Sequence, residues 1–369
     1  MKVLHVINSL KAGGAEKLIE DLLPRMNGRD GIQIDVLLLT NDGNVFGKSL
    51  IEAGISIYVA PLKSIYNPLN IIYLRWHILK HKYDMIHVHL FPASYWVAMS
   101  KRSILAWKPK LVLTEHSTHN KRREKWYLRG LEKFVYSTYD RVISVSKQAQ
   151  ENLVRWLNPA DNSKFLVIEN GVDIEKFAQA EPYKKSEICD SFSDDTKLIC
   201  MVGRFTEAKD QATLIKAMTK IPDNVHLLLV GEGPLKEENK ALSKEIGVKD
   251  RVHFLGFRND IPRILKTIDI FVLSSNWEGL PLALVEGMAS GKPVIGSNAP
   301  GIKEVLTGAG LLFHVGNSDE LAREINELVC EKSKYEDISR KCQERASNYS
   351  LEKMVERYVS VYTELLKTR

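Results

Sequence analysis

Residues 270–291 read IFVLSSNWEGLPLALVEGMASG, and this stretch contains one complete strand–loop–helix unit. The apolar run 270–273 is typical of a buried strand, and the polar loop after it leads into an apolar helical segment. Pro281 suits the first helical position, where its missing N–H costs nothing. Gly291, with Pro293 just beyond, predicts the end of the helix. The stretch therefore predicts a β–α unit with a polar turn at the carboxyl end of its strand.

Similar apolar runs recur along the chain, separated by longer amphipathic stretches. In the first half the runs are 2–7, 32–38, 56–60, 85–88, 110–113, 141–145 and 165–168, and in the second half they are 198–202, 225–230, 252–254, 270–273, 294–296 and 310–313. Helical patterns such as 15–26 and 147–157 lie between them. This alternation predicts an α/β fold with mostly parallel sheets covered by helices on both faces.

The chain has 369 residues, which favours two domains over one core. The polar, acidic segment 176–196 interrupts the strand–helix rhythm and is interpreted as a linker. We expect one Rossmann-like, doubly wound domain over 1–175 and a second over 197–350, facing across a cleft. Charged helical patterns end the chain, and the last of them, 351–369, carries an apolar stripe. Ligands of such folds bind outside the carboxyl ends of the strands.

Composition excludes several classes of protein. Apolar residues make up 44% and charged residues 27%, as in ordinary globular domains, and the 4 cysteines form no CxxC pair. No apolar run approaches the roughly 18 residues of a membrane span, and the first residues lack a signal-peptide pattern. A net charge of +6 is too modest to argue for nucleic acid. We expect a cytoplasmic protein without a zinc site or a disulfide framework.

The stretch 121–129, KRREKWYLR, mixes basic and aromatic residues. One interpretation is a solvated helix face. The other is a surface that meets anionic lipid or a phosphate-bearing acceptor, peripherally on the inner face of the membrane. The sequence leaves both open.

Two glutamates flank the predicted helix start in the opening stretch. The amides of Gly279, Leu280 and Leu282 would lie at a helix N-terminus, where backbone N–H groups favour an anion such as a diphosphate. Glu286, four residues after Leu282, would accept the hydroxyls of a ribose beyond the phosphates. Glu278 would lie on the other side, beside a sugar. The alternative is that both glutamates only face solvent.

The segment EGLPLALVE (278–286) has the E-x7-E spacing of the retaining GT-B glycosyltransferases of family 4, the "glycosyl transferases group 1" set, and the resemblance covers nearly the whole chain. It implies an enzyme, a hexosyltransferase, that moves a sugar from a nucleoside diphosphate donor to an acceptor. It also implies that the C-terminal helix packs back onto the first domain.

The resemblance assigns donor-binding roles to loops of the second domain. Arg204 and Lys209 follow its first strand and would clamp the diphosphate, where fixed cations offset the charge that builds up as the leaving group departs. The family usually has Lys-Gly here, whereas this chain has Lys209-Asp210. Gly231 and Phe257 follow the next two strands and would frame the nucleobase. Because no Asp-x-Asp motif follows a strand, we expect no metal and no other cofactor.

The first domain would supply the opposite wall. Gly13 and Gly14 lie between the first strand and the first helix, and the resemblance implies that this loop touches the donor diphosphate. The pattern is not GxGxxG, which disfavours a nicotinamide cofactor. Glu16 would lie near the acceptor. His116, after a buried strand, would lie near the donor sugar, and His89 is a further acceptor-side candidate; for both, the alternative is an ordinary structural histidine.

The resemblance implies front-face substitution with retention, in which the leaving phosphate takes the acceptor's proton. Glu278 would then position the sugar and stabilise the transition state, and would not act as a general base. UDP-sugars are favoured as donors, and a glycan or lipid-linked acceptor in bacterial surface polysaccharide assembly is expected. An epimerase or phosphorylase on the same fold, and an inactive sugar-nucleotide binding module, are the alternatives.

Overall fold

The computed structural model describes residues 1–11, 13–102, 109–116 and 121–367. Ala12 in the expected glycine loop and residues 368–369 of the expected C-terminal helix lie outside this set. The chain divides into two compact units, Met1–Asn170 with Leu351–Arg369, and Gly171–Ser350.

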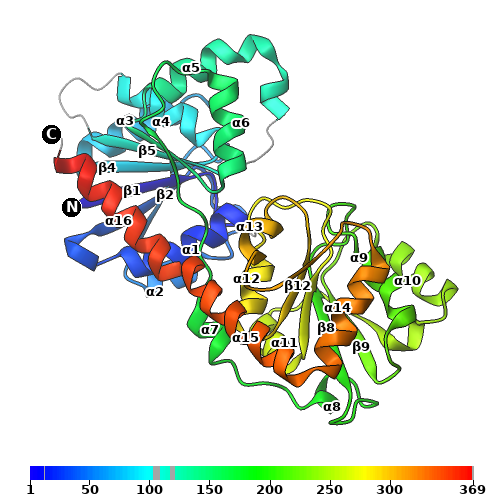
Figure 1. The fold of residues 1–369 in the computed structure, drawn as a ribbon. Coiled ribbons are helices and arrows are strands. Elements are labelled where there is room, and N and C mark those ends of the chain that lie inside the picture. Colours follow the sequence, from blue (N-terminus) through cyan, green and yellow to red (C-terminus); the bar gives the residue numbers. More distant parts are fainter. Residues whose placement is uncertain (12, 103–108, 117–120, 368–369) are drawn as a thin grey trace. The chain divides into compact units, whose positions relative to one another are not determined.

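The first unit contains a parallel sheet in the order β3-β2-β1-β4-β5-β6-β7. Figure 1 labels β2, β1, β4 and β5 of this sheet. Its strands are β1 (Lys2–Ile7), β2 (Gln33–Leu38), β3 (Ser56–Val59), β4 (Met85–His89), β5 (Lys110–Glu115), β6 (Arg141–Ser144) and β7 (Phe165–Val167). Its helices are α1 (Gly14–Met26), α2 (Gly47–Glu52), α3 (Asn70–His81), α4 (Ala93–Arg102), α5 (Arg129–Ser137), α6 (Lys147–Leu157) and α16 (Leu351–Lys367). Apolar side chains of α1, α2 and α16 form one core, and those of α3 to α6 form another. Since alternate residues of a buried strand face opposite sides, the strands supply both cores.

The second unit repeats this plan with the strand order β10-β9-β8-β11-β12-β13, again parallel. The strands are β8 (Lys197–Val202), β9 (Val225–Val230), β10 (Val252–Gly256), β11 (Ile270–Leu273), β12 (Val294–Ser297) and β13 (Leu311–Phe313). The helices are α7 (Ile174–Ala178), α8 (Lys185–Ile188), α9 (Gln211–Ala217), α10 (Lys236–Glu245), α11 (Ile261–Thr267), α12 (Leu282–Ala289), α13 (Ile302–Leu306), α14 (Ser318–Cys330) and α15 (Lys332–Ala346). Helix α9 packs against α10 and α14, while α12 packs against α7, α11 and α15. The predicted α/β class with two doubly wound Rossmann-like domains is confirmed.

The boundaries of the units differ from the predicted ones. The expected linker 176–196 packs as part of the second unit: Phe192 is buried in its core, and the backbone N–H of Tyr183 donates to Thr267 Oγ1 at 2.8 Å. The few apolar side chains of the segment explain this packing. They are buried against the second unit, although most of their neighbours in sequence are polar. Helix α16 belongs to the first unit, where its stripe of Leu351, Met354, Val355, Tyr358 and Val359 is buried.

Among the described residues, no helix combines the length and the apolar character needed to cross a bilayer.

Candidate donor site

The loop after β11 departs from the predicted geometry at the helix start. Helix α12 begins at Leu282, so Pro281 is its N-cap and not its first residue. The N–H of Leu282 donates to the carbonyl of Leu280 at 3.0 Å. The expectation that this amide is free is therefore wrong, because Pro281 turns the chain tightly just before the helix. The amides of Gly279 and Leu280 make no hydrogen bond within the described residues and remain available to an anion.

Glu278 lies in a polar, partly enclosed environment. Its Oε1 atom accepts hydrogen bonds from Lys209 Nζ at 2.6 Å and from Ser275 Oγ at 2.7 Å. The side chain of Glu278 is only 12% exposed and that of Lys209 22%. A carboxylate so enclosed requires paired charge and hydrogen bonds, and this pair supplies both. The alternative that Glu278 merely faces solvent is thereby ruled out.

The loop that carries Lys209 is held by the loop that carries Glu278. Ser274 Oγ donates to the carbonyl of Asp210 at 2.7 Å, and Asn276 Nδ2 donates to the carbonyl of Glu207 at 2.7 Å. These bonds join the loops that follow the carboxyl ends of β8 and β11. The ion pair between Lys209 and Glu278 therefore depends on both loops. Ser274, Ser275 and Asn276 were not predicted as site residues, although their place directly after a buried strand was a usable signal.

The conformation of Asp210 explains why aspartate can stand where the family usually has glycine. Its backbone is left-handed, with φ 45° and ψ 54°, a conformation that glycine adopts freely and aspartate more readily than most residues. Its carboxylate accepts from the N–H of Thr213 at 3.3 Å and so caps α9. At the position where the family usually has glycine, Asp210 thus adopts a backbone conformation that glycine also favours, and its carboxylate adds a cap.

Arg204 lies on the same edge of the sheet and is exposed. Its guanidinium makes no ion pair with any residue that the structure describes. The turn around it is tight: a Cβ added to Gly231, whose φ is +140°, would lie 2.2 Å from the carbonyl oxygen of Gly203. Because Gly231 has no side chain, the two loops can approach each other closely. Phe257, after β10, is 75% exposed and free to meet a ligand.

These groups surround the point where the strand order of the second sheet reverses. Strands β9 and β10 lie on one side of β8, and β11 lies on the other. Arg204 and Lys209 follow β8, and Glu278 follows β11. In doubly wound sheets, ligands bind at this switch point, outside the carboxyl ends of the strands.

Gly301 supports the Glu278 loop from the next strand. The carbonyl of Pro300 accepts from the N–H of Glu278 at 3.3 Å. A Cβ on Gly301, whose φ is +87°, would lie 2.5 Å from the carbonyl oxygen of Glu278 and 2.7 Å from that of Gly279. Sequence reasoning missed this residue, because Pro-Gly after a strand reads as an ordinary turn. Glu286, half-buried on α12, lies one helical turn beyond Leu282, as predicted.

In the first unit, Gly13 is the N-cap of α1, and the Glu16 side chain folds over it. A Cβ on Gly13 would lie 2.3 Å from Glu16 Oε2, whereas one on Gly14 would meet nothing within 4 Å. Glu16 is buried, and this burial raises the pKa of its carboxyl. The carboxylate thus occupies the helix N-terminus, the position at which an anion binds most readily.

The two predicted histidines differ in accessibility. His89 is fully buried, and its two ring nitrogens contact His5 Nδ1 and His116 Nε2, each at 3.1 Å. His89 therefore makes no contact with solvent in this structure, and its predicted acceptor-side role would have to act through His116. His116 is half-buried at the end of β5, so its ring can meet a ligand. Burial lowers the pKa of His116 to about 4, which keeps the ring neutral.

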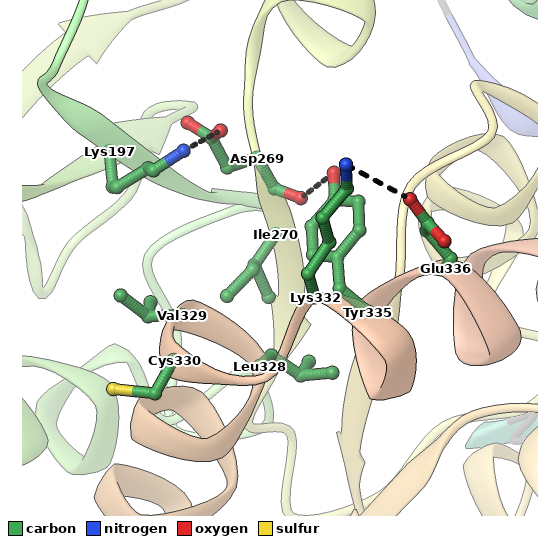
Figure 2. A pocket seen from close by; sticks show the side chains of 9 residues that line it. All are labelled: Lys197, Asp269, Ile270, Leu328, Val329, Cys330, Lys332, Tyr335 and Glu336. Carbon is green, nitrogen blue, oxygen red and sulfur yellow. Dashed lines mark hydrogen bonds and ion pairs between the residues drawn. The ribbon is translucent and has the colours of Figure 1, made fainter.

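A cavity in the second unit lies away from these residues. Figure 2 shows its lining, which includes Lys197 at the start of β8 and Asp269 just before β11. Lys197 Nζ lies 3.4 Å from Asp269 Oδ1. The cavity is therefore at the amino ends of the strands, opposite the edge that carries Glu278, and it is not part of the donor site.

Comparison with known proteins identifies the family to which the chain is similar. Residues 12–176 match the family described as "Glycosyltransferase Family 4", and residues 187–345 match "Glycosyl transferases group 1". The UDP-Gal:alpha-D-GlcNAc-diphosphoundecaprenol alpha-1,3-galactosyltransferase of Escherichia coli is 30% identical over 304 residues, covering 78% of this chain and 77% of that protein.

A second relative and a solved structure extend the match. An N-acetylgalactosaminyltransferase of Campylobacter jejuni, named for a diphospho-undecaprenol substrate, is 26% identical over 338 residues, or 88% of each chain. The crystal structure of HepE from Anabaena in complex with UDP aligns with a TM-score of 0.81 at 24% identity, covering 99% of this chain and 100% of that one.

Proposed function

The chain belongs to family 4 of the GT-B glycosyltransferases, and we propose that it transfers a sugar with retention of anomeric configuration from a UDP-sugar to a lipid-linked glycan. The observation that carries the proposal is the contact between Lys209 Nζ and Glu278 Oε1 at the switch point of the second sheet. It supports the proposal because Lys209 would supply the cation for a diphosphate and Glu278, next to it, the carboxylate for a sugar.

Donor binding would exchange the partners of this pair. A diphosphate between Arg204 and the free amides of Gly279 and Leu280 would draw Lys209 to its oxygens, since phosphate carries more charge than one carboxylate. Glu278, still bonded to Ser275, would then accept from a sugar hydroxyl. Glu286, one turn into α12, would accept from the ribose hydroxyls.

The same groups account for catalysis. Arg204 and Lys209 would offset the charge that develops on the leaving diphosphate, the role a divalent metal plays elsewhere. Glu278 would stabilise the positive charge that develops on the sugar. The leaving phosphate would take the acceptor's proton on the same face, which gives retention without a protein nucleophile.

The named relatives favour the donor and acceptor classes. The Escherichia coli relative is named for UDP-Gal and a diphosphoundecaprenol-linked acceptor, and the Campylobacter jejuni relative for a diphospho-undecaprenol acceptor. HepE was crystallised with UDP. These names support a UDP-sugar and a polyprenyl-diphosphate acceptor for this chain.

A lipid-linked acceptor requires access to a membrane surface, and one surface of the first unit suits this. Tyr127, Leu131 and Phe134 are exposed at spacings of four and three, so they lie on one side of α5 and the turn η3 (Trp126–Leu128) before it. Trp126 beside them is 81% exposed, and Lys133 is exposed on the same helix. Aromatic and basic side chains together favour peripheral contact with anionic lipid on the inner face of the membrane.

A transfer assay with a panel of nucleotide sugars and a polyprenyl-diphosphate disaccharide tests the proposal. We expect one UDP-sugar to raise the melting temperature and to extend the acceptor, with product NMR showing retained configuration. Interconversion of the donor without an acceptor would instead identify an epimerase. Binding without transfer to any acceptor would identify an inactive module.

A further inference from the structure

A row of buried imidazoles crosses the first unit from α16 to the end of β5. In the sheet register, His5 of β1 pairs with His87 of β4, and His89 pairs with Thr114 of β5. All four residues therefore face the same side of the sheet, the side that α16 covers. His5, His87 and His89 are fully buried, as is Tyr362 of α16.

These side chains form one unbranched chain of hydrogen bonds. His116 Nε2 lies 3.1 Å from His89 Nδ1, and His89 Nε2 lies 3.1 Å from His5 Nδ1. His5 Nε2 lies 3.3 Å from the Tyr362 hydroxyl.

The chain then turns back into the sheet. The Tyr362 hydroxyl also contacts His87 Nδ1, and His87 Nε2 lies 2.7 Å from Thr114 Oγ1. Within the described residues, no carboxylate or ammonium group contacts any member, and burial lowers the pKa of each histidine.

A neutral imidazole has one donor and one acceptor, so the chain has two self-consistent proton arrangements. In one, every proton points from His116 towards Thr114. In the other, every proton points from Thr114 towards His116, which leaves His116 with its proton on Nδ1. Tyr362 donates once and accepts once in both.

The end of the chain at Thr114 selects between the two arrangements. The Thr114 hydroxyl bonds to His87, and beside it lies the buried Tyr358 hydroxyl, which has no other partner among the described residues. If His87 donated, Thr114 would donate to Tyr358, and the buried hydroxyl proton of Tyr358 would have no acceptor. An unsatisfied buried donor is costlier than an unused lone pair, so Thr114 donates and all protons point towards His116.

We propose that Tyr362, His5 and His89 are positioning residues that hold His116 as the neutral Nδ1–H tautomer, a fixed hydrogen-bond donor at the carboxyl edge of the sheet. Its ligand would be an oxygen of the sugar or the acceptor, and this part rests on the proposed function. A metal site made of His5, His87 and His89 does not fit: the rings of His87 and His89 stack at 4.4 Å with 25° between planes, and in-plane lone pairs of stacked rings do not converge on one ion.

Nitrogen NMR of the full chain labelled with ¹⁵N-histidine tests the tautomer directly, with His116 assigned by its loss in His116→Gln. Tyr362→Phe breaks the chain at its centre. Tyr358→Phe is the matched control, one turn away on the same helix and equally buried. In this variant Thr114 ends the chain and, without another acceptor among the described residues, still donates to His87. We expect the Nδ1–H form of His116 in the wild type and in Tyr358→Phe, and a mixture of tautomers in Tyr362→Phe.

Several results would overturn the proposal. These are an Nε2–H form of His116 in the wild type, the same His116 signals in all three proteins, equal shifts in both phenylalanine variants, or a stoichiometric metal ion that His5→Gln releases. A Tyr362→Phe variant that does not fold leaves the wild-type tautomer as the deciding measurement.

Activity provides a second readout. Tyr362→Phe should lower kcat about tenfold, as for the loss of one oriented hydrogen bond, and leave nucleoside diphosphate affinity unchanged. If the wild type transfers no sugar, the proposed function fails, and the NMR outcome still decides on the tautomer.

Discussion

Lys209 Nζ lies 2.6 Å from Glu278 Oε1, and this bond joins the loops that follow β8 and β11. The cation expected to hold the donor phosphates is therefore neutralised here by the carboxylate expected to hold the sugar. Donor binding must break or share this bond, so the two residues are energetically coupled.

The coupling predicts opposite effects for the two glutamates. Glu278→Gln frees Lys209 and removes a negative charge beside the phosphates, so nucleoside diphosphate affinity should stay unchanged or rise by up to about tenfold, while sugar transfer falls at least about a hundredfold. Glu286→Gln should weaken the same affinity about tenfold. Isothermal calorimetry with UDP measures both, and equal losses would contradict the division of roles.

The two cations should differ in their effect on stability. Lys209→Met leaves the mostly buried Glu278 carboxylate without its ion pair and should cost about 1–3 kcal/mol of unfolding free energy. Arg204→Met removes an exposed guanidinium and should cost under about 0.5 kcal/mol. Both should weaken UDP binding. Urea unfolding compares the variants, and equal stability would show that the ion pair does not hold the two loops.

Gly301 should be required for the geometry of the Glu278 loop. Gly301→Ala places a methyl group against the carbonyls of Glu278 and Gly279 and should abolish UDP binding, with a loss of about 1–3 kcal/mol of stability. Gly316→Ala is the matched control, because its φ of +75° imposes similar backbone strain, and its added Cβ meets nothing within 4 Å. If Gly316→Ala bound UDP as weakly as Gly301→Ala does, backbone strain and not the contact with the two carbonyls would explain the loss.

The buried histidines should make the protein sensitive to mild acid. Burial lowers the pKa of His5 to about 3 and of His116 to about 4, from 6.5. Between these values and 6.5, the unfolded chain binds more protons than the folded one, so stability is full above about pH 6.5 and falls as the pH drops. Each of these histidines should contribute at most about 1.4 kcal/mol per pH unit to the loss of unfolding free energy.

Urea unfolding at pH 7.5, 6.5 and 5.5 measures this slope. His5→Gln should reduce it, because it removes a fully buried imidazole. An unchanged slope in His5→Gln would assign the acid sensitivity to other groups.

The exposed aromatic surface of η3 and α5 should bind anionic vesicles. Trp126→Ser with Phe134→Ser should reduce co-sedimentation with phosphatidylglycerol vesicles about tenfold or more, because apolar burial contributes about 25 cal/mol per Å². Lys133→Gln should reduce co-sedimentation more than Lys332→Gln, which makes the same substitution on α15 of the second unit. Binding that persists in the double variant would place any membrane contact elsewhere.

The sequence by itself determined the strand–helix alternation, most strand boundaries and the residues at the strand ends. Strong local patterns explain this: runs such as 270–273 are apolar whatever their neighbours are, and Glu278 and Glu286 keep their spacing along the chain. Family membership followed from the same local signals.

Tertiary structure decided what those residues touch. The pairing of Lys209 with Glu278, the support from Gly301 and the burial of His89 all depend on which strands become neighbours, and that order is not local in sequence. The hydrogen bond of the Leu282 amide is another contact that the sequence did not predict, since the turn at Pro281 could not be read from composition. The imidazole chain is the clearest case, because His5, His89 and Tyr362 come together only when β1 and β4 pair in the sheet and α16 packs on that face of it.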